Sequence, residues 1–135
     1  MKKFGLVLAA ACGVAALGFS NLSWAEDLSV AVVSGKRTAV ASYGSYNTFE
    51  CTAAAVPQYR IGRMPAHGSV EVREERRVMD AGRCGNVSAH LLIVYYTAAR
   101  GFRGQDAAAV DFTIFAFGEG AETRTERVNI SIQVR

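Results

Sequence analysis

The strongest constraint on the fold is a strict two-residue alternation of apolar and polar side chains. It is clearest in RVNISIQVR, residues 127–135. The apolar members are Val128, Ile130, Ile132 and Val134. Successive side chains of a β-strand point to opposite faces, so this run predicts a strand with one buried and one solvated face.

Several other runs have the composition or alternation of strands. They cover residues 28–34, 37–43, 56–62, 69–73, 91–97 and 110–117. Glycine next to polar residues separates many of them, at residues 34–36, 66–69, 81–86 and 117–122, which is typical of turns. The best helical candidate is a single turn in GQDAAAV, residues 104–110, with Asp106 as its cap. About seven short strands without a convincing helix predict an all-β fold, an antiparallel β-sandwich.

The N-terminal 25 residues have the pattern of a secretory signal peptide. Lys2 and Lys3 precede a long uncharged apolar run, and Ser23 and Ala25 occupy the small-residue positions of a cleavage site. We therefore predict a signal peptide over residues 1–25 and a single domain over residues 26–135, located in the periplasm or secreted. Lipidation of Cys12 is an alternative, although the leucine usual three residues before such a cysteine is absent.

Removal of this segment changes the charge of the chain. Without Lys2 and Lys3 the 15 basic residues become 13, against 12 acidic ones, so the net charge falls to about +1. A nucleic-acid partner is not expected, since such binding needs basic residues concentrated on one face. No stable membrane span is expected after cleavage.

Two cysteines remain in the predicted mature chain, Cys51 and Cys84. An even pair in an oxidising compartment predicts a disulfide, which stabilises a closed loop of this size by roughly 3–4 kcal/mol. Two buried free thiols are the alternative. Neither cysteine has further ligands at the short spacing of a metal site.

The segment YYTAARGFRGQD, residues 95–106, predicts a corner between two strands. Gly101 and Gly104 permit a compact loop, and Phe102 between them can fold inward against the core. Asp106 can accept hydrogen bonds from backbone N–H groups of the loop. With Tyr96, these residues are the predicted structural corner.

This pattern resembles bacterial immunoglobulin-like and cadherin-like (Bap-type) repeat domains over about half of the predicted mature chain. Those domains begin with Pro-x-x-Gly-x-Val, here at Pro65, Gly68 and Val70. Their centre is Tyr-x-Pro-x-x-Gly-Phe-x-Gly-x-Asp, and they close with Val-x-Val-x-Val. The chain matches that centre at Tyr96, Gly101, Phe102, Gly104 and Asp106, but Ala98 and Ala99 stand near the place of the family proline. The resemblance implies a single exported immunoglobulin-like unit without catalytic activity.

Catalytic and metal-binding chemistry have little support in the sequence. No serine lies in a G-x-S-x-G context, and the only histidines, His67 and His90, are expected in a turn and at a strand end. Met64, His67 and Met79 have the soft or borderline donors of a copper carrier but form no clustered motif. No Asp-x-Asn-x-Asp cluster suggests calcium. We expect no enzyme activity, cofactor or metal.

Arginines are the candidate partner contacts. VREERR, residues 72–77, predicts a solvated hairpin tip with opposite charges, and its arginines form the predicted rim together with those of the 95–106 segment. The members of this rim are Arg73, Arg76, Arg77, Arg100 and Arg103, and Arg63 is a further contributor. The predicted function is an exported binding or structural module with a protein or envelope-glycan partner. A periplasmic copper carrier and an inhibitor of a secreted enzyme are the alternatives.

Overall fold

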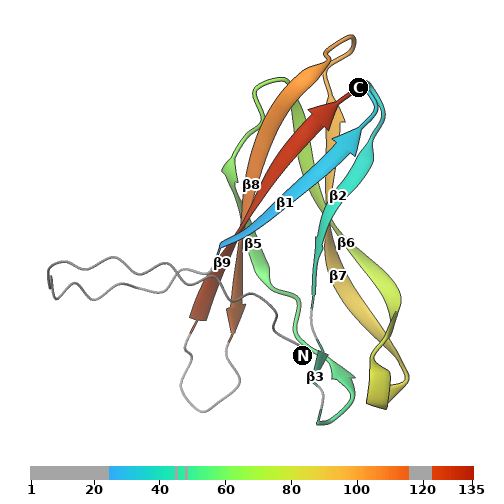
Figure 1. Cartoon of the computed structure of the whole chain (residues 1–135). Coiled ribbons are helices and arrows are strands. Elements are labelled where there is room, and N and C mark those ends of the chain that lie inside the picture. Colours follow the sequence, from blue (N-terminus) through green and yellow to red (C-terminus); the bar gives the residue numbers. More distant parts are fainter. Residues whose placement is uncertain (1–24, 45, 48, 116–122) are drawn as a thin grey trace, which may run out of the picture.

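A computed structural model describes residues 25–44, 46–47, 49–115 and 123–135, which form nine strands and one 3₁₀ turn (Figure 1). The strands are β1 (Ala25–Val32), β2 (Thr38–Tyr43), β3 (Tyr46–Asn47), β4 (Thr52–Ala53), β5 (Gln58–Arg63), β6 (Gly68–Asp80), β7 (Asn86–Ala98), β8 (Gly104–Phe115) and β9 (Thr123–Val134). The turn η1 (Gly82–Cys84) lies between β6 and β7. The predicted signal peptide lies outside the described residues except for Ala25, where β1 begins, and the predicted turn at residues 117–122 lies outside them too.

The strands form three sheets. One has four strands in the order β1-β9-β8-β5, the second has three in the order β2-β7-β6, and the short β3 and β4 form the third. β1 runs parallel to β9, and every other pair is antiparallel. Within the described residues no helix is long and apolar enough to cross a membrane.

The two larger sheets share one hydrophobic core. Tyr96 and Val94 of β7 are fully buried together with Phe112 of β8 and Ile130 and Ile132 of β9. The β9 residues are the apolar half of the alternation from which the strand was predicted. Because successive residues alternate between faces, one side of each sheet supplies this core and the other side is available for polar contacts.

Three details of the fold differ from the sequence-based prediction. The described chain has nine strands instead of seven, and the first pairs in parallel with the last. The predicted helical turn at residues 104–110 is wrong, since these residues begin β8. Ala108 and Ala109 are buried there opposite Ile130 and Asn129 of β9. Pairing and burial in the sheet thus override the weak local helix propensity of the alanines.

The charged run at residues 72–77 is also placed differently. It is the middle of β6, a strand of 13 residues that pairs along its whole length with β7, from Gly68 opposite Ala98 to Asp80 opposite Asn86. The prediction of a hairpin tip is therefore wrong. The chain reverses instead at η1, where glycines with positive φ at Gly82 and Gly85 make the turn. His90 consequently lies inside β7 and not at its end.

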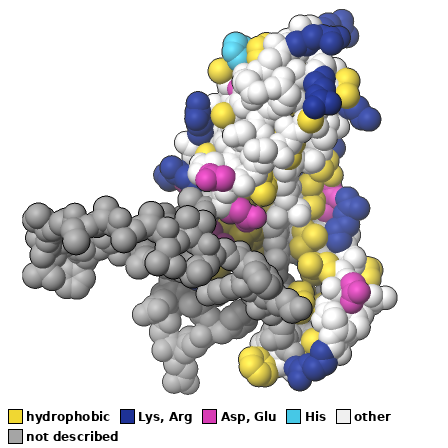
Figure 2. Space-filling model, viewed as in Figure 1, with side chains coloured by type: hydrophobic (Ala, Val, Ile, Leu, Met, Phe, Trp, Pro, Cys, Tyr) yellow, Lys and Arg dark blue, Asp and Glu magenta, His cyan; other side chains and the backbone are white. Residues whose placement is uncertain are grey.

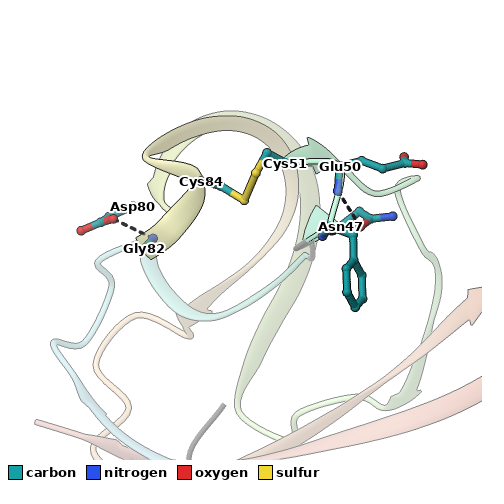
Figure 3. Close-up of a disulfide and its surroundings, with 7 residues drawn as sticks. Asn47, Glu50, Cys51, Asp80, Gly82 and Cys84 are labelled. Atoms are coloured by element: carbon teal, nitrogen blue, oxygen red, sulfur yellow. Dashed lines mark hydrogen bonds between the residues drawn. A yellow bond between two sulfur atoms is a disulfide. The ribbon is translucent and has the colours of Figure 1, made fainter.

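The predicted disulfide between Cys51 and Cys84 is present and fixes this distant end of the β6–β7 hairpin. It joins η1 to the turn between β3 and β4, with 5.2 Å between the two Cα atoms (Figure 3). A side chain further stabilises each turn. Asn47 Oδ1 accepts hydrogen bonds from the backbone N–H groups of residues 49 and 50, and Asp80 Oδ1 accepts one from the backbone N–H of Gly82. β2 stops opposite Leu92, so the disulfide clamps a part of the hairpin that β2 does not cover.

Candidate functional site

The predicted corner residues meet around a buried carboxylate. Asp106, 7% exposed, accepts a hydrogen bond from the Tyr96 hydroxyl at 2.8 Å. It also accepts the backbone N–H groups of Ala66 at 2.9 Å, His67 at 3.0 Å and Ala107 at 2.9 Å. Asp106 and Tyr96 belong to β8 and β7, whereas Ala66 and His67 belong to the loop before β6. One carboxylate therefore ties two strands to a loop 40 residues earlier in the chain.

The electrostatics of this carboxylate favour its ionised form. Burial alone would raise the pKa of Asp106, but the hydrogen bonds from Tyr96 and from three backbone N–H groups hold that pKa below its usual value. Burial and the adjacent carboxylate raise the pKa of the Tyr96 hydroxyl well above its usual range. The pair is thus a charge-assisted hydrogen bond between a neutral tyrosine and a carboxylate.

The loop between β7 and β8 packs on the loop between β5 and β6. Gly101 has φ of 80°, which permits the tight turn, and the Phe102 ring stacks on the His67 imidazole with 4.2 Å between centroids. Ala99 N–H donates to the carbonyl of His67 at 2.8 Å. Phe102 therefore contacts a neighbouring loop as well as the edge of the core.

Gly68 is required for the same junction. A Cβ atom there would lie 2.5 Å from the Thr97 carbonyl oxygen and 2.7 Å from the Tyr96 ring. The absence of a Cβ atom at this position thus allows β6 to lie directly against the buried tyrosine. We call the region formed by residues 33–37, 64–67 and 99–103 the loop end.

The predicted arginine rim divides into two separate groups. Arg100 and Arg103 lie at the loop end, exposed, and neither makes an ion pair with a described residue. Arg73 and Arg77 instead lie along β6, where each pairs with a glutamate two residues before it. Arg76 points to the opposite face of β6 and donates to the Ser88 hydroxyl at 2.7 Å.

The loop end gathers further positive charge. Lys36 lies in the β1–β2 turn, and Arg135 is joined to the same turn because Ser34 N–H donates to its carbonyl at 2.9 Å. Arg103 and Arg135 flank the last pair of β8 and β9, Gly104 with Val134. Figure 2 shows several dark blue Lys and Arg side chains at the upper end, where these loops lie, and most of the magenta acidic side chains lower down. Asp106 near this end is buried and already bound, and Glu71 is bound by Arg37 of the loop end.

A second buried carboxylate, Asp111, was not predicted as a site residue. It lies 5% exposed on the outer face of the four-stranded sheet, between two arginines on neighbouring strands. Arg127 binds it in a bidentate manner, at 2.6 and 2.9 Å, and Arg60 binds at 3.0 Å. The hydrogen bonds from Arg127 are the main reason why the pKa of Asp111 lies below its usual value. Burial alone would raise this pKa. A Cβ atom on Gly62 would lie 2.9 Å from its Oδ2, so glycine leaves the room for this cluster.

A shallow groove of about 510 Å³ opens between the two larger sheets at the β5 and β6 edges. Its lining is mainly apolar, with one carboxylate, and comprises Val56, Pro57, Gln58, Tyr59, Val72, Glu74 and Leu92. Glu74 is engaged by His90, whose Nδ1 lies 2.7 Å from its Oε1. None of these lining residues is a serine, cysteine or histidine, so among the described residues the groove does not assemble a nucleophile with a base.

The residues considered for metal binding are not brought together. His67 lies at the loop end just before β6, whereas Met79 lies opposite Val87 near the other end of β6. Met64, 59% exposed, lies near His67 in the chain. Among the described residues no group of three or more His, Cys, Asp or Glu side chains is placed to hold a metal ion.

Comparisons with known proteins identify no family. No protein-family model matches the chain, and no curated protein matches it. The chain is similar to a solved structure described as the solution structure of Amebosin, with 9% sequence identity and a TM-score of 0.45. That alignment covers 84% of this chain and 98% of the other.

Proposed function

We propose that the protein is an exported, immunoglobulin-like binding module without catalytic activity, and that its loop end holds an anionic glycan of the bacterial envelope. The order of the strands supports the immunoglobulin-like part of this proposal. β5, β8 and β9 correspond to strands C, F and G of such domains, and β2, β7 and β6 correspond to B, E and D. β1 would be strand A, moved from the B edge to the G edge, where it runs parallel to its neighbour.

The observation that carries the binding proposal is the pair of exposed arginines on a braced loop. Arg100 and Arg103 project from a loop that is held to His67 by the hydrogen bond from Ala99 N–H and by the stacking of Phe102. Asp106 in turn holds the backbone N–H of His67. Because neither arginine is bound to a described carboxylate, their guanidinium groups remain available to an incoming anion. Guanidinium forks bind carboxylate and phosphate groups in a bidentate manner.

A rigid loop strengthens this argument. Binding loses less conformational freedom when the contacting groups are already held in place. Lys36 and Arg135 extend the positive surface beyond the two arginines, which suits a polymer with repeated negative charges better than a single small anion. The arginines of β6 are less suitable, since their glutamate neighbours already offset their charge.

We propose no catalytic activity because the histidines and the buried carboxylates lie apart and are each bound by other groups. His67 is stacked at the loop end, and His90 is engaged by Glu74 in the β6–β7 hairpin. The two buried carboxylates, Asp106 and Asp111, are each saturated by donors. These arrangements favour structural roles for the groups from which an acid or base would be drawn.

The experiment measures retention of the purified protein by acidic polysaccharide from the envelope, with neutral dextran as the comparison matrix. Replacement of both loop arginines, Arg100→Glu with Arg103→Glu, is expected to lower the affinity at least tenfold, and added salt is expected to weaken wild-type binding. Arg76→Glu, on β6 away from the loop end, is the control and should retain binding. Equal retention of the double variant and the wild type would refute the proposal. Capture of a folded protein and no polysaccharide would also refute the choice of a glycan.

A further inference from the structure

The edge of the three-stranded sheet is unusually long and open. β6 pairs with β7 along all of its 13 residues, and no other described strand pairs with its free side. An unpaired strand edge presents backbone N–H and C=O groups to which another strand can add. Short strands, proline or charged side chains usually protect such edges. β6 is long and contains no proline, and its charged side chains are of both signs.

Alternating charge marks the outer face of this strand. Side chains two residues apart share a face, and on this face β6 presents Glu71, Arg73, Glu75 and Arg77 in succession. Arg73 contacts Glu71 at 2.6 Å, and Arg77 contacts Glu75. Arg37 from the loop before β2 also binds Glu71, and the Tyr95 hydroxyl of β7 binds Glu75, which fixes the positions of both glutamates.

We propose that two copies of the chain associate by antiparallel pairing of their β6 strands about a two-fold axis at Glu74. Glu74 is the middle residue of Gly68–Asp80, so this register lets the whole strand pair with its copy. It places Glu71 opposite Arg77 of the second copy and Arg73 opposite Glu75 of the second copy. The symmetry repeats both contacts, so the dimer contains four cross-strand pairs of opposite charge, and directly opposite charges stabilise a sheet.

Neighbouring registers do not have this complementarity. An axis at Arg73 places Arg73 opposite itself and Glu71 opposite Glu75, whereas an axis at Glu75 places Arg73 opposite Arg77. Each of these pairs like charges, which destabilises the sheet. Axes between two residues are excluded by the hydrogen-bond pattern, because successive residues direct their backbone groups to alternate sides of the strand. The alternation of charges along β6 thus favours the same register that pairs the largest number of residues.

The other face of β6 gives the interface one kind of apolar contact, which the symmetry repeats, and one repulsive contact on the axis. Val78, 71% exposed in the single chain, comes opposite Val70 of the second copy. The two Glu74 side chains meet on the axis, although each already has His90 within 2.7 Å. This repulsion supplies a specific test, since loss of the charge at Glu74 must tighten the dimer.

Sedimentation equilibrium of the purified, oxidised protein tests the proposal with two charge variants. The all-arginine variant carries Glu71→Arg and Glu75→Arg, and the all-glutamate variant carries Arg73→Glu and Arg77→Glu. We expect the wild type to dimerise below about 1 mM and each variant alone to stay monomeric. An equal mixture of the two should form heterodimers, because every cross-strand pair is then Arg opposite Glu. Far-UV circular dichroism verifies that each variant keeps its β-sheet spectrum.

Glu74→Gln provides a second test that does not depend on those variants. It should tighten the dimer several-fold, whereas the control Ser131→Gln, on the exposed outer face of β9, should leave the association unchanged. A wild type that is monomeric at about 1 mM overturns the proposal. So does a mixture of two folded charge variants that fails to associate, or a Glu74→Gln dimer no tighter than the wild type. The inference does not rest on the proposed glycan binding, which uses the loop end.

Discussion

The hydrogen bond between Tyr96 and Asp106 can be tested by the single substitution Tyr96→Phe. The ring of Tyr96 is completely buried and packs in the core, so phenylalanine keeps its volume and removes the hydroxyl alone. The lost bond is 2.8 Å long and ends on an ionised carboxylate. Hydrogen bonds to charged groups contribute about 1.5–3 kcal/mol to stability.

The structure places the expected effect near the middle of that range. Asp106 keeps three backbone N–H donors after the substitution, so its carboxylate is not left without partners. We therefore expect Tyr96→Phe to lower the free energy of unfolding by about 2 kcal/mol. For a domain of this size that corresponds to a fall in Tm of roughly 8 °C.

Urea denaturation followed by far-UV circular dichroism measures this change. Tyr59→Phe is the matched control, because Tyr59 is 47% exposed and its hydroxyl makes no hydrogen bond with a described residue. It should alter stability by less than about 0.5 kcal/mol. Repeating Tyr96→Phe in an Asp106→Asn background should give a smaller loss, with a coupling of about 1 kcal/mol. If both tyrosine variants unfolded at the same urea concentration, Asp106 would not anchor the corner as argued.

Three further predictions follow from the buried carboxylates, the disulfide and the strand junction. The pKa values of Asp106 and Asp111 are lower in the folded protein than in the unfolded chain, so the stability that they contribute is complete above about pH 5 and is lost as the pH falls below about 4. The urea midpoint, measured as a function of pH, should therefore fall in this range. In Asp106→Asn it should fall less steeply. Reduction of Cys51–Cys84, which closes a separation of 33 residues, should cost about 3–4 kcal/mol, and a reduced protein equally stable in urea would contradict that entropy argument. Gly68→Ala should destabilise by about 2 kcal/mol or more because its Cβ meets backbone, whereas Ala53→Gly in the exposed β4 should change the melting temperature little.

Strand positions were predictable from the sequence because one face of each long strand is buried. The alternation around Ile130 and Ile132 matches β9, and the apolar run at residues 91–97 matches the C-terminal half of β7, a strand with neighbours on both sides. The run at residues 56–62 matches β5, which is the last strand of its sheet. The cysteine pairing was predictable because only two cysteines remain after residue 25.

Features set by distant contacts were not predictable in this way. Val72 still packs against the core, but residues 73–77 are all charged, and this part of β6 pairs with β7 alone among the described strands. Local composition therefore suggested a turn. The parallel pairing of β1 with β9 joins the two ends of the described chain, and no local signal encodes that choice.

The candidate site shows the same division. Tyr96 and Asp106 could be placed at a corner from their spacing, but the donors from Ala66 and His67 come from a loop about 40 residues away. The arginines of the rim could be identified from their residue type, but the sequence does not indicate where they lie in space. The single predicted group is therefore divided between the loop end and β6. Asp111 was missed although an aspartate between Val110 and Phe112 of a strand is a signal that a partner is needed.

An NMR titration of isotope-labelled protein with the acidic envelope polysaccharide tests the central claim most directly, since amide chemical shifts report binding residue by residue. The account predicts that the largest changes fall at His67, Arg100, Phe102 and Arg103, while the disulfide end around Cys84 stays unchanged. Changes centred on the disulfide end or on the β5–β6 groove, or no changes at all, would contradict it.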